Sequence, residues 1–346
     1  MFAGIDTHKD TLAVAVIDTG GRVITMCELP NQDDGFTELA ALMCRHQVAR
    51  VGIEGSTNFG WAAAMLLLSE GVNIVEVPPL MTSRERRSRP GQGKTDPVDS
   101  VAIARITARE TTLPPVRPMT GPAADLRVLM DYRDQLVTER TATANRVHSD
   151  LGWLRPGYQH QLPRLTNPAH LRQGVDLLAG DASVRAAVTR NRLTRMIAIN
   201  AELRALRLQI TALLTASGTT LPAYGVGPFV AARILAEVFD VRRYPSRHHF
   251  AAANGSAPIP ASSGRTVRYR LNRGGNRQLS RALYTVAITE IRADTEGRAY
   301  YLRKRSEGKT SREALRCLKR RLSDVVYRTL RADLATTQRP QLIGPA

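Results

Sequence analysis

The sequence predicts an α/β domain at the amino terminus, followed by a larger and mostly helical region. Short β-rich runs alternate with helical patterns over residues 1–115, whereas residues 121–217 carry long helical periodicities. The balance of charged residues changes at nearly the same place in the chain. Residues 1–120 hold 12 Lys and Arg against 14 Asp and Glu, and the remaining residues hold 37 against 17. A chain of 346 residues is long enough for two or three domains with separate cores.

The first 30 residues have the pattern of three adjacent strands. Residues 2–5 and 12–17 are apolar and rich in residues that favour strands. The dipeptide Gly20-Gly21 is a tight hairpin signal, so residues 22–29 are expected to return as a third strand.

Helices and strands alternate after this hairpin. The pattern predicts a helix around Phe36 to Met43, a strand at 51–54, a helix at 59–68, a strand at 72–77, and a helix with Asp96 as N-cap and Pro97 at its first position. The resulting order, β-β-β-α-β-α-β-α, is that of a ribonuclease-H-like sheet.

Four acidic residues occupy related places in this predicted domain. Asp6 and Glu54 end or interrupt strands, whereas Asp96 and Asp99 lie one turn apart on the last helix. Strand ends can face one helix, so the four carboxylates are expected to converge. Such a cluster repels itself at neutral pH unless divalent cations occupy it, and its oxygen ligands suit Mg²⁺ or Mn²⁺. We therefore predict metal-assisted cleavage of a phosphodiester.

A net charge of +18 indicates a polyanionic partner. A basic segment also runs between the last predicted strand and the acidic helix. It either holds the strand that is cut or forms a solvated loop, and charge alone does not separate these interpretations. Its candidates for nucleic-acid contact are Arg84, Arg86, Arg87, Arg89 and Lys94.

Long helical patterns follow a proline-rich linker. Residues 126–154 fit one amphipathic helix, and a weak polar stretch at 155–180 interrupts the pattern. Apolar residues then recur at spacings of 3, 4, 3, 4 and 3: Met196, Ile199, Leu203, Leu206, Ile210 and Leu213. This coiled-coil rhythm fits either a helical hairpin within the chain or a seam between two copies. We predict that it contributes to oligomerisation.

The basic carboxyl-terminal third contains two loops of interest. Gly225 and Gly227 precede an apolar helix, a setting that suits a phosphate, although a simple turn between helices needs the same glycines. Ser263 lies among small residues and arginines, where a hydroxyl could attack phosphorus; taken alone, Ser-Gly is more often a turn. The candidate nucleic-acid contacts in this third are Gly225, Gly227, Arg265, Arg268, Arg270, Arg273 and Arg277.

Short motifs along the whole chain occur in a distinctive order. They are Gly4-Ile5-Asp6-Thr7-x-Lys9, Glu54-Gly55, Lys94-Thr95-Asp96-x-x-Asp99, Gly225-Val226-Gly227, Phe250-Ala251, Ser263-Gly264 and Gly275-Asn276. In this order and spacing the chain resembles the DEDD transposases of the bacterial IS110 insertion-sequence family. That family includes bridge-RNA-guided recombinases and has Piv-type DNA invertases as relatives.

The resemblance implies a domain plan and a set of roles. It implies a RuvC-like catalytic domain at 1–115, a helical dimerising region at 121–217, a transposase domain at 218–335 and a tail at 336–346. The metal ligands would be Asp6, Glu54, Asp96 and Asp99, and Ser263 would be the nucleophile that links to DNA; Ser262 precedes it with a second hydroxyl. The implied partners are donor DNA, target DNA and a noncoding bridge RNA, with homodimers that pair as tetramers in the synaptic complex.

Two other functions remain open from the sequence. One is a metal-only nuclease, such as a RuvC-like Holliday-junction resolvase, in which water attacks. The other is a nucleic-acid-binding protein without chemistry, in which the acids only cap helices.

The sequence also predicts a location. Its three cysteines lack metal spacing, no signal peptide opens the chain, and the longest apolar run, residues 61–68, is too short to span a bilayer. We therefore expect a soluble cytoplasmic protein without a membrane partner, and the resemblance implies association with the bacterial nucleoid.

Overall fold

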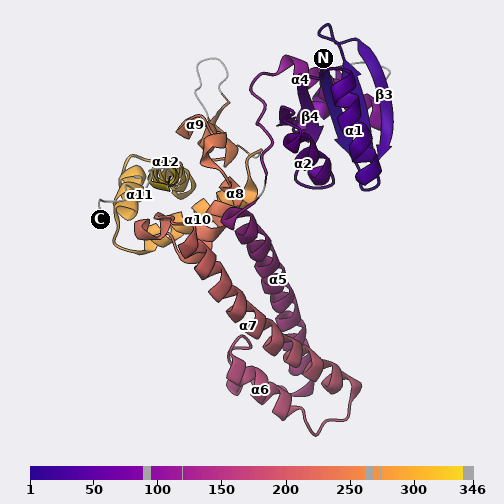
Figure 1. Cartoon of the computed structure of the whole chain (residues 1–346). Coiled ribbons are helices and arrows are strands. Elements are labelled where there is room, and N and C mark those ends of the chain that lie inside the picture. Colours follow the sequence, from indigo (N-terminus) through magenta and orange to yellow (C-terminus); the bar gives the residue numbers. More distant parts are fainter. Residues whose placement is uncertain (89–94, 119, 262–268, 271, 273, 338–346) are drawn as a thin grey trace, which may run out of the picture. The chain divides into compact units, whose positions relative to one another are not determined.

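The computed structural model describes residues 1–88, 95–118, 120–261, 269–270, 272 and 274–337 (Figure 1). The chain forms two compact units, Met1–Pro118 and Met119–Ala346.

The first unit is built on a five-stranded mixed sheet with the order β3-β2-β1-β4-β5. The strands are β1 (Phe2–Thr7), β2 (Thr11–Ile17), β3 (Val23–Pro30), β4 (Arg50–Glu54) and β5 (Ile74–Glu76). The first three pair antiparallel, and β4 and β5 continue the sheet parallel to β1. The predicted strand order and the ribonuclease-H-like arrangement are therefore confirmed.

Alternate side chains of β1 serve the two faces of this sheet. Ala3 and Ile5 join an apolar core with residues of α1 (Asp33–Arg45) and α2 (Trp61–Ser69). Gly4 faces α4 (Asp96–Arg109), where an added Cβ would lie 2.2 Å from both the Ala104 nitrogen and the Ser100 oxygen. Only glycine permits this approach, which brings the first turn of α4 to the end of β1.

A helix that the sequence did not predict precedes α4. The segment from Arg84 was expected to be a loop, but α3 (Pro79–Arg87) includes it up to Arg87, with a proline in its first turn. The helix was missed because Thr82 is its one buried residue, so it has no apolar stripe. A smaller correction concerns α4, whose N-cap is Thr95 and not Asp96.

The second unit contains a long helical hairpin. Figure 1 shows α5 (Pro122–Leu154) and α7 (Val184–Ala216) side by side, with α6 (Pro168–Leu177) packed on α7. The connection between α5 and α7 was predicted to be weak and polar. It contributes buried side chains to a core that it shares with α5 and α7, among them Tyr158, Leu162, Leu165 and Leu171.

The regular apolar seam of α7 packs inside the chain. Met196, Ile199 and Ile210 are fully buried, and Leu206 is nearly so. Ile199, Leu206 and Ile210 share a core with α5 and with helices nearer the carboxyl terminus. These contacts support the hairpin interpretation of the seam, and its contribution to oligomerisation stays a prediction.

Removing a buried methyl-rich side chain from this seam should destabilise the protein. Ile199→Ala is expected to lower the free energy of unfolding by about 2–5 kcal/mol, because the side chain is fully buried. Leu208→Ala on the same helix should change it by no more than about 0.5 kcal/mol, since Leu208 is exposed. Urea unfolding at several protein concentrations checks this. A loss that shrinks at high concentration would place the seam between copies.

The rest of the second unit is mostly helical. Its elements are η1 (Tyr158–His160), η2 (Leu221–Tyr224), α8 (Pro228–Val238), η3 (Val241–Arg243), α9 (Arg247–Ala253), α10 (Arg277–Arg292), α11 (Glu296–Ser306), α12 (Ser311–Thr337) and the paired two-residue strands β6 (Ile259–Pro260) and β7 (Tyr269–Arg270). Buried Arg233 ties α8 to α5, with its guanidinium 2.6 Å from Asp131 Oδ1 and 3.0 Å from Asp134 Oδ2. None of the helices in the described part of the chain combines the length and apolarity needed to cross a membrane.

Candidate active site

The four predicted carboxylates come from three neighbouring elements of the first unit. Asp6 lies directly opposite Glu54 in the parallel register of β1 and β4. Asp96 and Asp99 occupy the first turn of α4, the helix that the glycine of β1 allows to approach the sheet. Asp6 and Asp99 are buried, whereas Asp96 and Glu54 are partly exposed. The structure therefore places all four acids at one end of the sheet.

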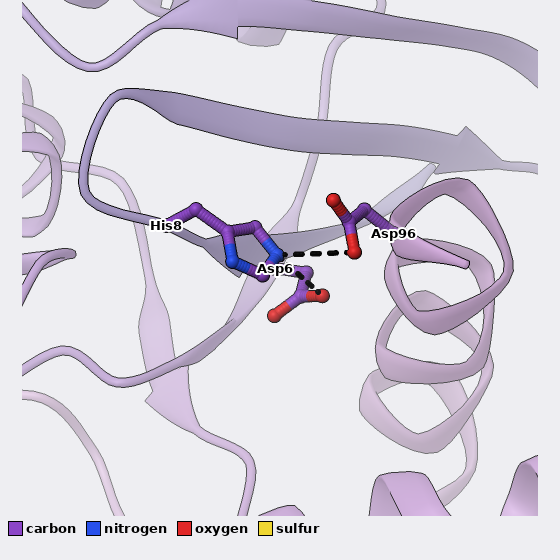
Figure 2. Close-up of side chains that lie close together, drawn as sticks. All are labelled: Asp6, His8 and Asp96. Carbon is purple, nitrogen blue, oxygen red and sulfur yellow. Dashed lines mark ion pairs between the residues drawn. The ribbon is translucent and has the colours of Figure 1, made fainter. Parts of the chain in front are cut away.

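A histidine that the sequence analysis did not single out lies between two of these acids. Figure 2 shows one ring nitrogen of His8 facing both Asp6 and Asp96, with an ion pair drawn to each. Its Nε2 atom is 3.4 Å from Asp6 Oδ2 and 3.2 Å from Asp96 Oδ1. The signal was present in the sequence, because His8 is two residues beyond Asp6 at the end of the same strand.

The chemistry of this group fits a divalent cation. One ligand atom from each of Asp6, His8 and Asp96 lies within 4.8 Å of the other two. The Nε2 atom of His8 is buried, yet it has no partner with hydrogen-bond geometry among the described residues. Two carboxylates and an imidazole are suitable ligands for such an ion.

The other two acids have partners on α3. The hydroxyl of Thr82 donates a hydrogen bond of 2.5 Å to Glu54 Oε2, and the guanidinium of Arg86 forms an ion pair with Asp99 Oδ1. Arg86 was predicted to contact nucleic acid. The described structure pairs its charge with a member of the acidic cluster, and its contact with nucleic acid stays a prediction.

The acids are close enough to affect one another's protonation. Burial raises the pKa of Asp6 above its ordinary value; His8 opposes the rise, and the carboxylates of Asp99 and Asp96 add to it. Burial also raises the pKa of Glu54, the hydrogen bond from Thr82 opposes this, and Asp6 and Asp99 add to it. A cation among these groups would offset both the repulsion between the carboxylates and the desolvation cost of burying them.

The remaining predicted nucleic-acid contacts have different settings. Arg84 and Arg87 are exposed in the last turn of α3, and Arg270 and Arg277 are exposed at β7 and at the start of α10. Arg89, Lys94, Arg265, Arg268, Arg273, Ser262 and Ser263 lie outside the described residues.

The predicted phosphate turn before α8 has an unfavourable neighbour. Gly225 adopts a left-handed conformation with φ of 75°, which explains why glycine occupies this position. An added Cβ there would lie 3.4 Å from Glu290 Oε1, so a carboxylate stands beside the turn. A phosphate at Gly225 and Gly227 would meet this negative charge. The turn between two helices is the function that the described contacts support.

The segment that contains the predicted serine begins and ends at one anchored point. An added Cβ on Gly275 would lie 2.3 Å from the Gly255 nitrogen, so the two backbones meet where only glycine fits. The Asn276 side chain caps α10 by accepting from the Leu279 nitrogen at 2.9 Å and donates to Glu237 Oε2 at 2.7 Å. The Gly275-Asn276 motif therefore has a structural explanation, because its glycine allows the backbone contact and its asparagine caps α10.

His8 is expected to strengthen metal binding at this site. His8→Ala should weaken Mn²⁺ binding by about 10-fold to 100-fold, because it removes one of three converging donors. Calorimetric titration of the protein without DNA measures this directly. His46→Ala, at the end of α1 in the same unit, is the matched control and should bind Mn²⁺ like the wild type. Equal affinity for all three proteins would exclude His8 from the site.

Two family models match separate segments of the chain. A DEDD transposase model of IS110 matches residues 3–156, and a model of the IS116/IS110/IS902 transposase family matches residues 220–302. Together these segments span more than half of the chain.

Relatives match over nearly the full length. An IS110 insertion-element protein from Streptomyces coelicolor is 28% identical over 96% of this chain and 94% of its own. An IS116 insertion-element protein from Streptomyces clavuligerus is 26% identical over 100% and 98%. A mini-circle putative transposase for IS117 from Streptomyces coelicolor is 25% identical over 89% and 88%.

Two solved structures of Thermus thermophilus RuvC are similar to part of the chain. One is in complex with a Holliday junction substrate and has 16% identity and a TM-score of 0.27. The other has 17% identity and a TM-score of 0.26. Each covers 33% of this chain and 98% of its own.

Proposed function

This chain belongs to the IS110 family of insertion-sequence transposases, enzymes that cut and rejoin DNA, and we propose that it does so with a metal site, a serine nucleophile and a guide RNA. The observation that carries the proposal is the convergence of Asp6, His8 and Asp96 beside Glu54 and Asp99. A cluster of this kind suits phosphodiester chemistry and has no comparable role in a protein that only binds.

The acidic cluster would position the phosphate that is cut. The DEDD set implies dependence on a divalent metal, and we propose Mg²⁺ or Mn²⁺ held by Asp6, Glu54, Asp96 and Asp99, with His8 as an added donor. When bound, the ion supplies charge neutralisation and polarisation at the scissile phosphate. Thr82 and Arg86 would hold Glu54 and Asp99 in place through the contacts described above.

Ser263 would be the nucleophile. Its hydroxyl oxygen would form a bond to phosphorus as the bond to the leaving DNA oxygen breaks, with the serine proton passing to that oxygen. The phosphoserine ester would conserve the energy of the broken bond, so rejoining needs no outside energy source. The motif match at Ser263 supports this role, as do the exposed Arg270 and Arg277 on either side of the anchored loop base.

A noncoding bridge RNA would supply sequence recognition by pairing with donor and target DNA. The excess of basic residues beyond residue 120 supports binding to several backbones at once. Because exchange requires cuts in two DNA segments, we propose that homodimers assemble as a tetramer on donor and target.

Sequencing of nucleic acid that copurifies with the protein tests the guide. The expected result is one RNA species with segments complementary to both donor and target, and strand transfer that stops after ribonuclease treatment and returns when that RNA is added. Full strand transfer by ribonuclease-treated protein would overturn RNA guidance while leaving the metal and serine proposals intact.

A further inference from the structure

A cavity of about 330 Å³ opens on the helical hairpin of the second unit. Two rows of side chains line it, at positions that share one face of each helix. Arg133 and Arg140 come from α5, Asn200, Arg204 and Arg207 come from α7, and Phe229 comes from the first turn of α8. None of these residues belongs to the acidic cluster or to the predicted serine loop.

The charge of this cavity is one-sided. Four guanidiniums line it, and the lining residues include no carboxylate among those the structure describes, although Arg133 forms an ion pair of 3.1 Å with Asp134 Oδ1 beside the cavity. Arg140 donates a hydrogen bond of 3.1 Å to Asn200 Oδ1, an amide oxygen that leaves the positive charge uncompensated. Arg204 and Arg207 are exposed and have no acidic partner in the described part of the chain. An anion would therefore find unneutralised donors here.

The same cavity presents a flat stack of a guanidinium on an aromatic ring. The guanidinium of Arg133 lies over the Phe229 ring, 4.5 Å from its centroid, and Phe229 is half-buried. Leu203 adds aliphatic surface next to the ring. A ligand with both a phosphate and a planar ring matches these arginines and this stack, because unpaired bases stack on guanidinium planes and aromatic rings.

We propose that this cavity binds one unpaired nucleotide of a nucleic-acid strand, with its phosphate against Arg140, Arg204 and Arg207 and its base on the stacked pair of Arg133 and Phe229. A duplex keeps its bases stacked inside, so it offers a cavity of this size only its backbone. The chemistry is shared by RNA and DNA. The proposal depends on neither Ser263 nor the metal site, so its failure would leave the proposals about the serine and the metal unchanged.

Salt dependence of strand binding tests the phosphate contacts. The full-length protein in EDTA is titrated, by fluorescence anisotropy, with a short uridine strand, a thymidine strand of equal length and a DNA duplex. Arg204→Ala and Arg207→Ala should each reduce the slope of log affinity against log salt by about 0.7 for the single strands. Arg146→Ala is the matched control, because Arg146 is an exposed arginine on another face of α5, and should leave the slope unchanged.

A second variant tests the stacking surface. Phe229→Leu should lower the affinity for the uridine strand by about tenfold. It should leave the salt slope and the affinity for an abasic strand unchanged. The larger effect on uridine or on thymidine identifies the strand as RNA or DNA. Equal slopes for Arg146→Ala, Arg204→Ala and Arg207→Ala would overturn the proposal. So would losses confined to the duplex, or an equal loss of abasic binding in folded Phe229→Leu.

Discussion

Replacing Asp6 with asparagine is expected to lower the rate of DNA cleavage by about a hundredfold to a thousandfold. The side chain keeps its size, but it loses the charge at the centre of the cluster. Asp6 faces Glu54 across paired strands, and its carboxylate is 3.4 Å from His8 Nε2. Single-turnover cleavage at saturating Mg²⁺ measures the loss.

Folding provides the control for this result. Without added metal, Asp6→Asn should unfold at the same temperature as the wild type or higher, because it removes a buried negative charge from among other carboxylates. Asp34→Asn, an exposed acid in the first turn of α1, should cleave normally. Full cleavage by folded Asp6→Asn, or cleavage that needs no divalent metal, would remove the metal site from the mechanism.

Local patterns were sufficient to predict the sheet and the positions of the acids. Strand periodicity, the Gly20-Gly21 hairpin and the alternation with helices determine the strand order, and that order places Asp6 beside Glu54. The proline and acids at residues 96–99 mark the start of α4.

The contacts that were missed depend on tertiary approach. His8 meets Asp96 only because α4 packs closely on β1 at Gly4, and no local pattern reports that distance. The helix α3 lacks an apolar stripe, so the contacts of Thr82 and Arg86 were missed with it.

The seam of α7 shows a different limit. A 3-4 rhythm states that a helix needs an apolar partner, but it does not state which one. The partner is α5, whose Leu126, Met130 and Leu136 lie in the same core as Ile199 and Leu206. A partner within the chain accounts for this rhythm, and oligomeric assembly stays a prediction.

Ser263→Ala is expected to abolish the covalent protein–DNA adduct while leaving DNA and RNA binding unchanged. A serine hydroxyl is a weak nucleophile at neutral pH, so it should act only when the metal site is assembled beside it, in the same copy or in another. Strand transfer should fall on the order of a thousandfold or more, as when other enzymes lose a covalent nucleophile. A denaturing gel that retains labelled DNA on the protein detects the adduct.

Ser262 is the decisive control for this prediction, because it offers the same hydroxyl one residue earlier. Ser262→Ala should still form the adduct, and mass spectrometry of the digested adduct should place the phosphate on Ser263. If the phosphate is on Ser262, the roles of the two serines are exchanged. If wild-type protein cuts DNA with Mg²⁺ and never forms an adduct, water is the nucleophile. The enzyme would then be a metal-only nuclease, because a phosphoserine ester that holds DNA must survive denaturation whereas attack by water leaves only a free end.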